Sequence, residues 1–164
     1  MDSLSGQILN QMIAYLGDDT RRINHALKVY GLTKTIAAAE KLSGESLEIL
    51  ETASILHDIG IKAAEQKYQS TAGSYQELEG PPIARELLAG FDLPAGFIDR
   101  VCYLIGHHHS YSKIDGIDFQ ILVEADFLVN IFEDNLSSRQ IQTIGEKYFK
   151  TESGRRCLSS MYPQ

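Results

Sequence analysis

The sequence predicts an all-α fold, a single-domain helical bundle. Apolar residues recur at offsets of three and four over almost the whole chain of 164 residues, which is the spacing of one face of an α-helix. Alternation of apolar and polar residues, which would predict strands, is nearly absent. Hydrophobic residues make up 43% of the chain and charged residues 23%, as in globular proteins with one core, so we expect one domain over residues 1–164.

Two helices are predicted in the first third of the chain. Side-chain oxygens at 18–20 can cap a helix that runs to about Leu42, and the Ser-Gly pair at 43–44 stops it. Glu45 then opens a second helix, which ends near His57, just before a glycine.

A long loop is predicted over residues 67–80, where Gln, Ser, Thr, Gly and Tyr mix without periodicity. Loops of this length are often functional. Pro81 and Pro82 suit the first turn of the next helix, which would run to Gly90, because the first turn leaves backbone N–H groups unpaired in any case.

Three more helices are predicted in the second half. Pro94 can lead a helix into the histidine run at 107–109, and a strongly apolar helix is expected around 121–132. Ser137 or Ser138 can cap a last helix. No internal repeat and no linker rich in Pro, Gly or Ser indicates a second domain.

Charge and cysteine content restrict the partners and the compartment. With 15 Lys+Arg against 22 Asp+Glu the formal charge is -7, so we expect neither long nucleic acids nor anionic membranes as partners. No apolar run reaches the roughly 18 residues of a membrane span, and the segment 1–16 lacks a basic leader followed by an apolar run. Cys102 and Cys157 are too few for a disulfide framework, which fits a cytoplasmic protein.

Several ionisable side chains fall on apolar helix faces, where they are costly unless they are paired or bound to a metal. His25 shares a face with Val29 and Leu32, at offsets of four and seven, and Asp126 shares one with Leu122. The groups expected to point inward are His25, His57, Asp58, His108 and Asp126. Their nitrogen and oxygen atoms suit one or two divalent ions such as Zn, Mn, Fe, Co, Ni or Mg.

The order of these residues resembles the signature of a known family. His25, then His57-Asp58 within Leu-His-Asp-Ile-Gly, then Asp126 is similar to the H…HD…D motif of the HD superfamily of metal-dependent phosphohydrolases, which have an all-α fold. The resemblance covers about residues 20–135. It implies that these four residues hold the main metal ion, with Asp58 able to bridge to a second ion.

Members of that superfamily with two metals add histidines from the middle of the chain. The resemblance implies that His108, with His109 or His107, plays that part here. Where such members often place one more histidine ahead of the next helix, this chain has Tyr-Gln-Glu-Leu-Glu, so Gln76 or Glu79 would have to substitute. A solvated helix end is the alternative for His107 and His109, because the helix dipole favours cationic side chains there.

The resemblance implies a hydrolase that acts on a phosphomonoester or phosphodiester of a small, nucleotide-like substrate through metal-activated water. Asp58 would then be a catalytic ligand. Basic side chains would grip the phosphate oxygens, and Lys62, four residues after Asp58, is the best placed, with Arg22 and Arg85 as further candidates. Surface charge is the alternative for all three, and the Glu-Asp pair at 133–134 is predicted to be a solvated helix end.

Two other functions stay open. Some similar HD-fold proteins hold two irons and oxygenate small molecules, which requires a complete dinuclear site. A non-catalytic module that binds a nucleotide through the metal is the second alternative. The sequence leaves the oligomeric state open, a homo-oligomer included.

Overall fold

Helices account for the regular structure of residues 3–164 in the computed structural model, and no strand occurs in this described part of the chain. The all-α prediction is therefore confirmed. Residues 1 and 2, which begin the segment screened for a leader, lie outside the described residues. The elements are α1 (Leu4–Leu16), α2 (Thr20–Ala39), α3 (Gly44–Leu56), α4 (Ile61–Tyr68), α5 (Gly73–Leu88), α6 (Ala95–His107), the 3₁₀ turn η1 (Tyr111–Lys113), α7 (Ile117–Glu133), α8 (Ser138–Tyr148) and α9 (Glu152–Met161).

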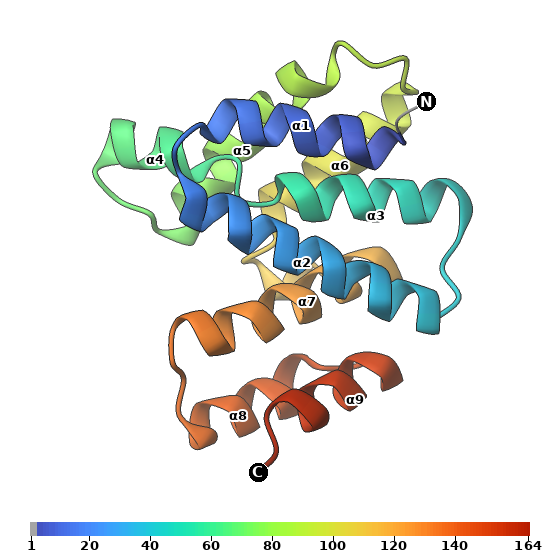
Figure 1. The fold of residues 1–164 in the computed structure, drawn as a ribbon, viewed down its shortest axis with the longest axis vertical. Helices are drawn as coiled ribbons and strands as arrows, with labels where there is room; N and C mark the ends of the chain where they lie inside the picture. The colour runs from blue at the N-terminus through green and yellow to red at the C-terminus, as the bar shows by residue number, and fades with distance from the viewer. Residues whose placement is uncertain (1–2) are drawn as a thin grey trace.

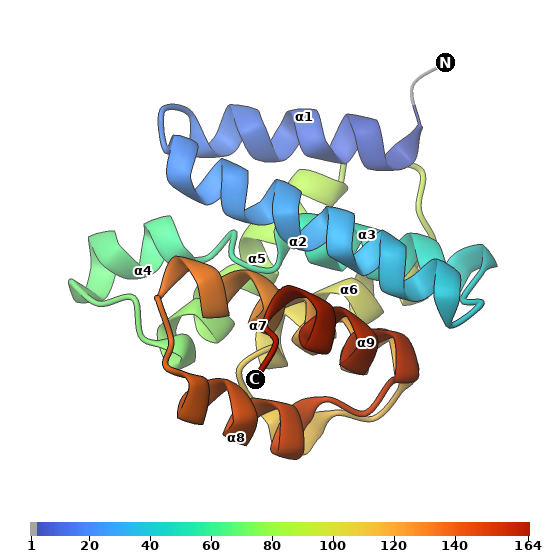
Figure 2. The ribbon, with the colours of Figure 1, turned by 60° about the horizontal axis from the view of Figure 1, so that its bottom comes forward.

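Helices α2, α3 and α7 form the middle of the bundle (Figure 1). Helix α1 packs on α2 and α3, α6 packs on α3 and α5, and the C-terminal helices α8 and α9 pack on α7 (Figure 2). Aliphatic side chains such as Val29 of α2, Leu50 of α3 and Leu122 of α7 are fully buried between these elements. Burial of each contributes about 1.5–3 kcal/mol to the stability of the fold. The three middle helices also bring His25, His57 and Asp126 together.

Capping residues fix the helix ends where the sequence predicts them. Asp19 is the N-cap of α2, and its side chain accepts a hydrogen bond from Arg22 N at 3.2 Å. Helix α3 occupies Gly44–Leu56, as predicted. Ser137 caps α8 in a reciprocal capping box with Gln140. None of the helices in the described residues has the length and hydropathy needed to cross a bilayer.

The long loop predicted over residues 67–80 is wrong. Helix α4 occupies the start of this segment and α5 begins at Gly73, so only a short connection separates the two helices. Gln76 and Glu79 are buried, at helical spacing from one another, but both are polar. The buried face of α5 therefore shows no apolar periodicity in its first turns, and this is why the sequence does not reveal it.

Pro81 and Pro82 accordingly lie inside α5 and not in its first turn. Each removes the backbone hydrogen bond that its N–H would donate one turn earlier. Gly106 of α6 approaches this turn closely, since a Cβ there would lie 3.0 Å from Pro81 Cγ. Packing of α6 against α5 thus helps to hold the proline-containing turn in place. Helices α1, α4 and α9 were not predicted from the sequence.

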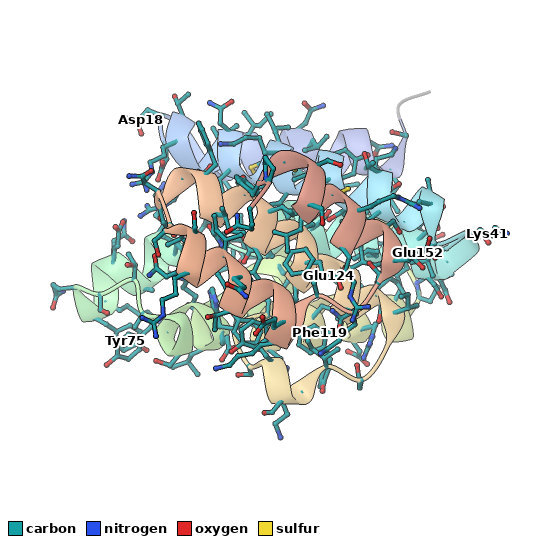
Figure 3. The ribbon with its side chains drawn as sticks, turned by 90° about the horizontal axis from the view of Figure 1, so that it is seen from below. Asp18, Lys41, Tyr75, Phe119, Glu124 and Glu152 are labelled. Carbon is teal, nitrogen blue, oxygen red and sulfur yellow. The ribbon has the colours of Figure 1, made fainter. Side chains whose placement is uncertain are left out.

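The buried side chain of Glu124 links the C-terminal helices to α7 (Figure 3). Its carboxylate accepts hydrogen bonds from Thr151 N at 2.9 Å, from Thr151 Oγ1 at 2.5 Å and from Gln120 Nε2 at 2.8 Å. A buried carboxylate is tolerated when its oxygens are satisfied in this way. Because Glu124 lies two residues before Asp126, this link anchors the turn of α7 that presents Asp126.

Substitution of Gly154 in α9 tests this link. A Cβ at Gly154 would collide with the Glu124 carboxylate and lie 2.7 Å from Thr151 Oγ1. We expect Gly154→Ala to lower the free energy of unfolding by about 1–3 kcal/mol, as overpacking does. Gly31→Ala in α2 is the matched control, because nothing lies within 4 Å of its added Cβ, and it should raise that free energy by about 0.5–1 kcal/mol. Urea unfolding followed by circular dichroism measures both, and equal effects would contradict the account.

Candidate metal centre

Three buried side chains from different helices meet in the middle of the bundle. His25 comes from α2, His57 from the end of α3 and Asp126 from α7. His25 Nε2 lies 3.1 Å from His57 Nε2 and 3.2 Å from Asp126 Oδ1, and His57 Nε2 lies 3.4 Å from Asp126 Oδ1. The fold thus brings His25 within hydrogen-bonding distance of a carboxylate 101 positions away in the chain.

Backbone carbonyls fix which nitrogen of two histidine rings faces the centre. His57 Nδ1 donates to Ser54 O at 2.7 Å, and His108 Nδ1 donates to Ile105 O at 2.8 Å. Because a carbonyl only accepts, each neutral ring carries its proton on Nδ1 and presents the lone pair of Nε2. His108 Nε2 is buried and makes no hydrogen bond to any described residue. Histidines that bind metals are commonly oriented in this way.

The spacing and chemistry of these donor atoms fit a divalent cation. Ligand atoms that lie roughly 2.1 Å from a shared ion are roughly 3.0–3.4 Å from one another. The atoms of His25, His57 and Asp126 are 3.1–3.4 Å apart. When both rings are neutral they carry their protons on Nδ1, so neither of the two facing Nε2 atoms has a proton to donate, and a cation between them stabilises the arrangement.

Asp58, His108 and His109 form a second group of donors, with ligand atoms within 4.8 Å of one another. Asp58 Oδ1 lies 3.3 Å from His108 Nε2, and Asp58 Oδ2 lies 3.3 Å from His25 Nε2. The Asp58 carboxylate therefore faces both groups with different oxygens, which is the position from which a carboxylate can bridge two ions.

The sequence offers three further candidates for completing a second metal site, and they lie in different places. His109 Nε2 donates to Gln76 Oε1 at 2.9 Å, so Gln76 lies beside the second group. Glu79 does not, because it accepts hydrogen bonds from a lysine and a tyrosine of α4. His107 Nδ1 donates to Tyr103 O at 2.7 Å, and His107 belongs to neither donor group.

His109 is held in its neutral form. Burial and the neighbouring ring of His108 lower the pKa of His109 to about 4. Gly73 at the start of α5 leaves room for the ring, since a Cβ at Gly73 would lie 2.9 Å from its atoms. A neutral imidazole is the form that binds a metal, so His109 is prepared for this role.

The carboxylates around the first group attract positive charge. Burial alone would lower the pKa of His25, but the hydrogen bond to Asp126, the charges of Asp58 and Asp126 and the hydrogen bond to Glu133 raise it to about 9. The pKa of His57 is also raised, because Asp58 and Asp126 outweigh its burial. Hydrogen bonds from the two rings hold the pKa of Asp126 well below its usual range despite burial. The same atoms can therefore hold a proton or a metal ion.

Glu133 was predicted to be part of a solvated helix end, and this is wrong. Its Oε2 accepts a hydrogen bond from His25 Nδ1 at 2.8 Å, and its Oε1 accepts one from Lys28 Nζ at 2.5 Å. Glu133 thus orients the His25 ring, which is a common role of carboxylates behind metal-binding histidines. The sequence contained a signal for it, because Glu133 follows Asp126 by seven residues and so lies on the same face of α7.

A cavity of about 500 Å³ opens onto both donor groups, and we call it the metal-site cavity. Its lining includes His25 and Asp126 of the first group and Asp58 and His109 of the second. In total, six carboxylate side chains and two arginines line it. The donor atoms are therefore accessible to a small molecule.

One of the three predicted phosphate-binding residues reaches this cavity. Arg22 lines it, but its guanidinium is already paired with Asp19 at 2.8 Å and with Glu65 at 2.7 Å. Arg21, which was not predicted, is exposed at the rim of the same cavity. It forms no ion pair with a described residue, so its charge is available to a ligand.

The structure does not bring Lys62 or Arg85 to the site. Lys62 Nζ donates to Tyr15 O at 3.2 Å, away from the cavity. Its offset of four from Asp58 does not place the two side chains together, because α4 begins only after Asp58. Arg85 pairs with Asp99 at 2.9 Å on the surface of α5 and α6.

Comparison with known proteins identifies the family. A sequence model described as HD domain matches residues 22–148. The chain belongs to the HD domain family. The crystal structure of a predicted HD superfamily hydrolase from an uncultured Thermotogales bacterium is similar, with a TM-score of 0.68 and 25% sequence identity over 94% of this chain and 83% of that chain. No curated protein matches the sequence.

Membership of the family confirms the resemblance inferred from the order of the histidine and aspartate residues. At the level of the family, the HD domain match and the similarity to a predicted HD superfamily hydrolase support a metal-dependent hydrolase. HD domains bind divalent metals, and the two groups of His and Asp donors could hold such ions here.

The stability of the metal-stripped HD domain is expected to fall as the pH rises from 6.5 to 9, because the pKa of His25 is about 9 in the fold against an ordinary 6.5. In this window the folded state binds more protons than the unfolded state. The contribution of protonated His25 is complete below pH 6.5 and lost above pH 9. The expected loss is up to about 3 kcal/mol, and urea unfolding in EDTA at several pH values measures it.

Two comparisons with the metal-stripped wild type test whether this pH dependence arises from His25 in the metal centre. Glu133→Gln removes one carboxylate that raises the pKa of His25. The stability of this variant should therefore decline less steeply with rising pH than that of the wild type. Metal-loaded protein should instead gain stability with rising pH, because deprotonated ligands bind a cation more tightly. A stability in EDTA that stays constant or rises across this window would contradict the assignment.

Proposed function

We propose that this HD domain hydrolyses a phosphomonoester or phosphodiester of a small substrate. The observation that supports this most strongly is that two donor groups share Asp58 beside one polar cavity. One divalent cation would be held by His25, His57, Asp58 and Asp126, and a second by Asp58, His108 and His109. A cation bound there polarises a phosphoryl oxygen, lowers the pKa of water and offsets charge in the transition state.

The charges around the metal-site cavity make phosphate binding depend on bound cations. Six carboxylates and only two arginines line the cavity, so the net negative charge of the side chains alone repels a phosphate ester. Divalent charge at the two donor groups reverses this balance locally. Binding of a phosphorylated substrate is therefore expected only in the metal-loaded protein.

Arg21 is the residue best placed to contact the phosphate. It lies at the rim of the cavity and, unlike Arg22, its guanidinium is not engaged by carboxylates. Asn130, one turn of α7 beyond Asp126, and Thr71 add neutral hydrogen-bonding groups to the lining. Together these side chains can orient a phosphate group against the donor groups.

The second donor group also bears on the oxygenase alternative. A di-iron oxygenase requires two complete ion sites, and the group of Asp58, His108 and His109 supplies donors for the second. We favour hydrolysis because the cavity combines these donors with an unpaired arginine at its rim, as a phosphate ester requires.

Hydrolysis of a phosphoester panel by purified, metal-loaded protein tests the proposal. The panel comprises p-nitrophenyl phosphate, bis(p-nitrophenyl) phosphate and nucleoside monophosphates. We expect phosphoester hydrolysis that is lost in Asp58→Ala, because this variant removes the carboxylate shared by both donor groups. Arg21→Ala should raise KM about 10- to 100-fold, since a hydrogen bond to a charged group contributes about 1.5–3 kcal/mol.

Arg85→Ala is the matched control, because this arginine pairs with Asp99 outside the cavity, and its KM should not change. Oxygen consumption by iron-loaded protein without phosphoester hydrolysis would support the oxygenase instead. Saturable nucleotide binding without turnover would support the binding module, and either result would contradict the proposal.

A further inference from the structure

Helix α9 packs against α2 and α7 (Figure 2). An apolar groove of about 680 Å³ lies at this junction, outside the metal-site cavity. We call it the α2–α9 groove, and Leu32, Val129, Phe132 and Met161 are among its lining residues. Phe132 is 75% exposed and Met161 is 45% exposed. Tyr162 also lines the groove, but its hydroxyl donates to a backbone carbonyl of α7 at 2.6 Å. The groove therefore offers hydrocarbon surface and few hydrogen-bonding groups.

One ion pair joins a residue that lines the α2–α9 groove to a residue that lines the metal-site cavity. Lys28 lines the groove, and its Nζ lies 2.5 Å from Oε1 of Glu133, which lines the cavity. The other Glu133 oxygen accepts the hydrogen bond from His25. Lys28 is one helical turn from His25, and Phe132 precedes Glu133 directly. Since side chains one turn apart are about 5–6 Å from each other, the groove begins next to the metal site.

The cavity and the groove together suit a ligand with a charged head and an apolar tail. Along α2 the groove extends from Lys28 to Thr35, a rise of about 10 Å. A nucleobase needs hydrogen-bonding partners for its edges, whereas an alkyl chain gains free energy from burial alone. A second copy of the chain is the poorer occupant, because a charge of -7 opposes self-association.

We propose that the α2–α9 groove binds the hydrocarbon part of the substrate, which is then a phosphate ester of an alkyl or similarly apolar alcohol. This inference rests on the proposed function for the phosphate head and narrows the organic part of the substrate. It departs from the nucleotide-like substrate that the resemblance implies. The head and tail meet at the Lys28–Glu133 pair, where the aliphatic stem of Lys28 can cover the first carbons of the tail.

Calorimetric titration of metal-loaded protein with ethyl phosphate and octyl phosphate tests the inference. Full burial of a methylene raises affinity about fourfold, and a groove open on one side should give about twofold. Octyl phosphate, with six more methylenes, should therefore bind about 60-fold more tightly than ethyl phosphate. Phe132→Ser and, separately, Met161→Ser should each remove a large part of this difference. Both side chains are exposed, so neither change disturbs the core.

Leu78→Ser is the matched control, because Leu78 is 60% exposed but lines neither the groove nor the cavity. It should leave both affinities unchanged. Equal affinities for the two esters, or a difference that survives both groove variants, would overturn the inference. A wild-type dimer that Phe132→Ser converts to a monomer in sedimentation would also overturn it, because a second copy would then cover the groove.

Phosphate release is measured separately from binding in the same samples. No release from either ester, with chain-length-dependent binding intact, would contradict the hydrolase proposal and leave the groove assignment standing. Release from ethyl phosphate without any preference for the longer chain would support the hydrolase and overturn the groove assignment.

Discussion

Imidazole nitrogens and carboxylate oxygens packed together in the interior of a helical bundle need a positive charge among them. The Nε2 atoms of His25 and His57 lie 3.1–3.5 Å from each other and from oxygens of Asp58 and Asp126. In the absence of a metal ion a proton supplies this charge, which is why the pKa of His25 is about 9. The helices α2, α3 and α7 that carry these groups are the middle of the bundle, so the packing of the fold is linked to the charge held at its centre.

The groups behind the donors explain how the fold keeps them in place. Backbone carbonyls one turn earlier hold the rings of His57 and His108, and the Glu133 carboxylate holds the ring of His25. Glu124, buried two residues before Asp126, joins α7 to the C-terminal helices. Because helices and their backbone fix the donors, the centre is preorganised for an ion.

Helical periodicity predicted most of the fold and the composition of the centre, since His25 has apolar neighbours at offsets of four and seven and Asp126 has them at three and four. It fails where buried faces are polar, as at Gln76 and Glu79, where the sequence predicts a loop and the structure has a helix. Closeness to Asp58 in the sequence does not bring Lys62 to the centre, because an offset of four places side chains together only within one unbroken helix. The interhelical contact of Glu133 with His25 depends on tertiary packing, which a local pattern does not contain.

Anomalous diffraction from crystals of the purified protein, recorded at the absorption edges of candidate metals, tests the central claim most directly. The account predicts a peak bounded by His25 Nε2, His57 Nε2 and oxygens of Asp58 and Asp126. A second ion, where present, should lie between Asp58, His108 and His109. A well-ordered centre without a peak at the first position, in a protein that binds its metal elsewhere, would contradict the account.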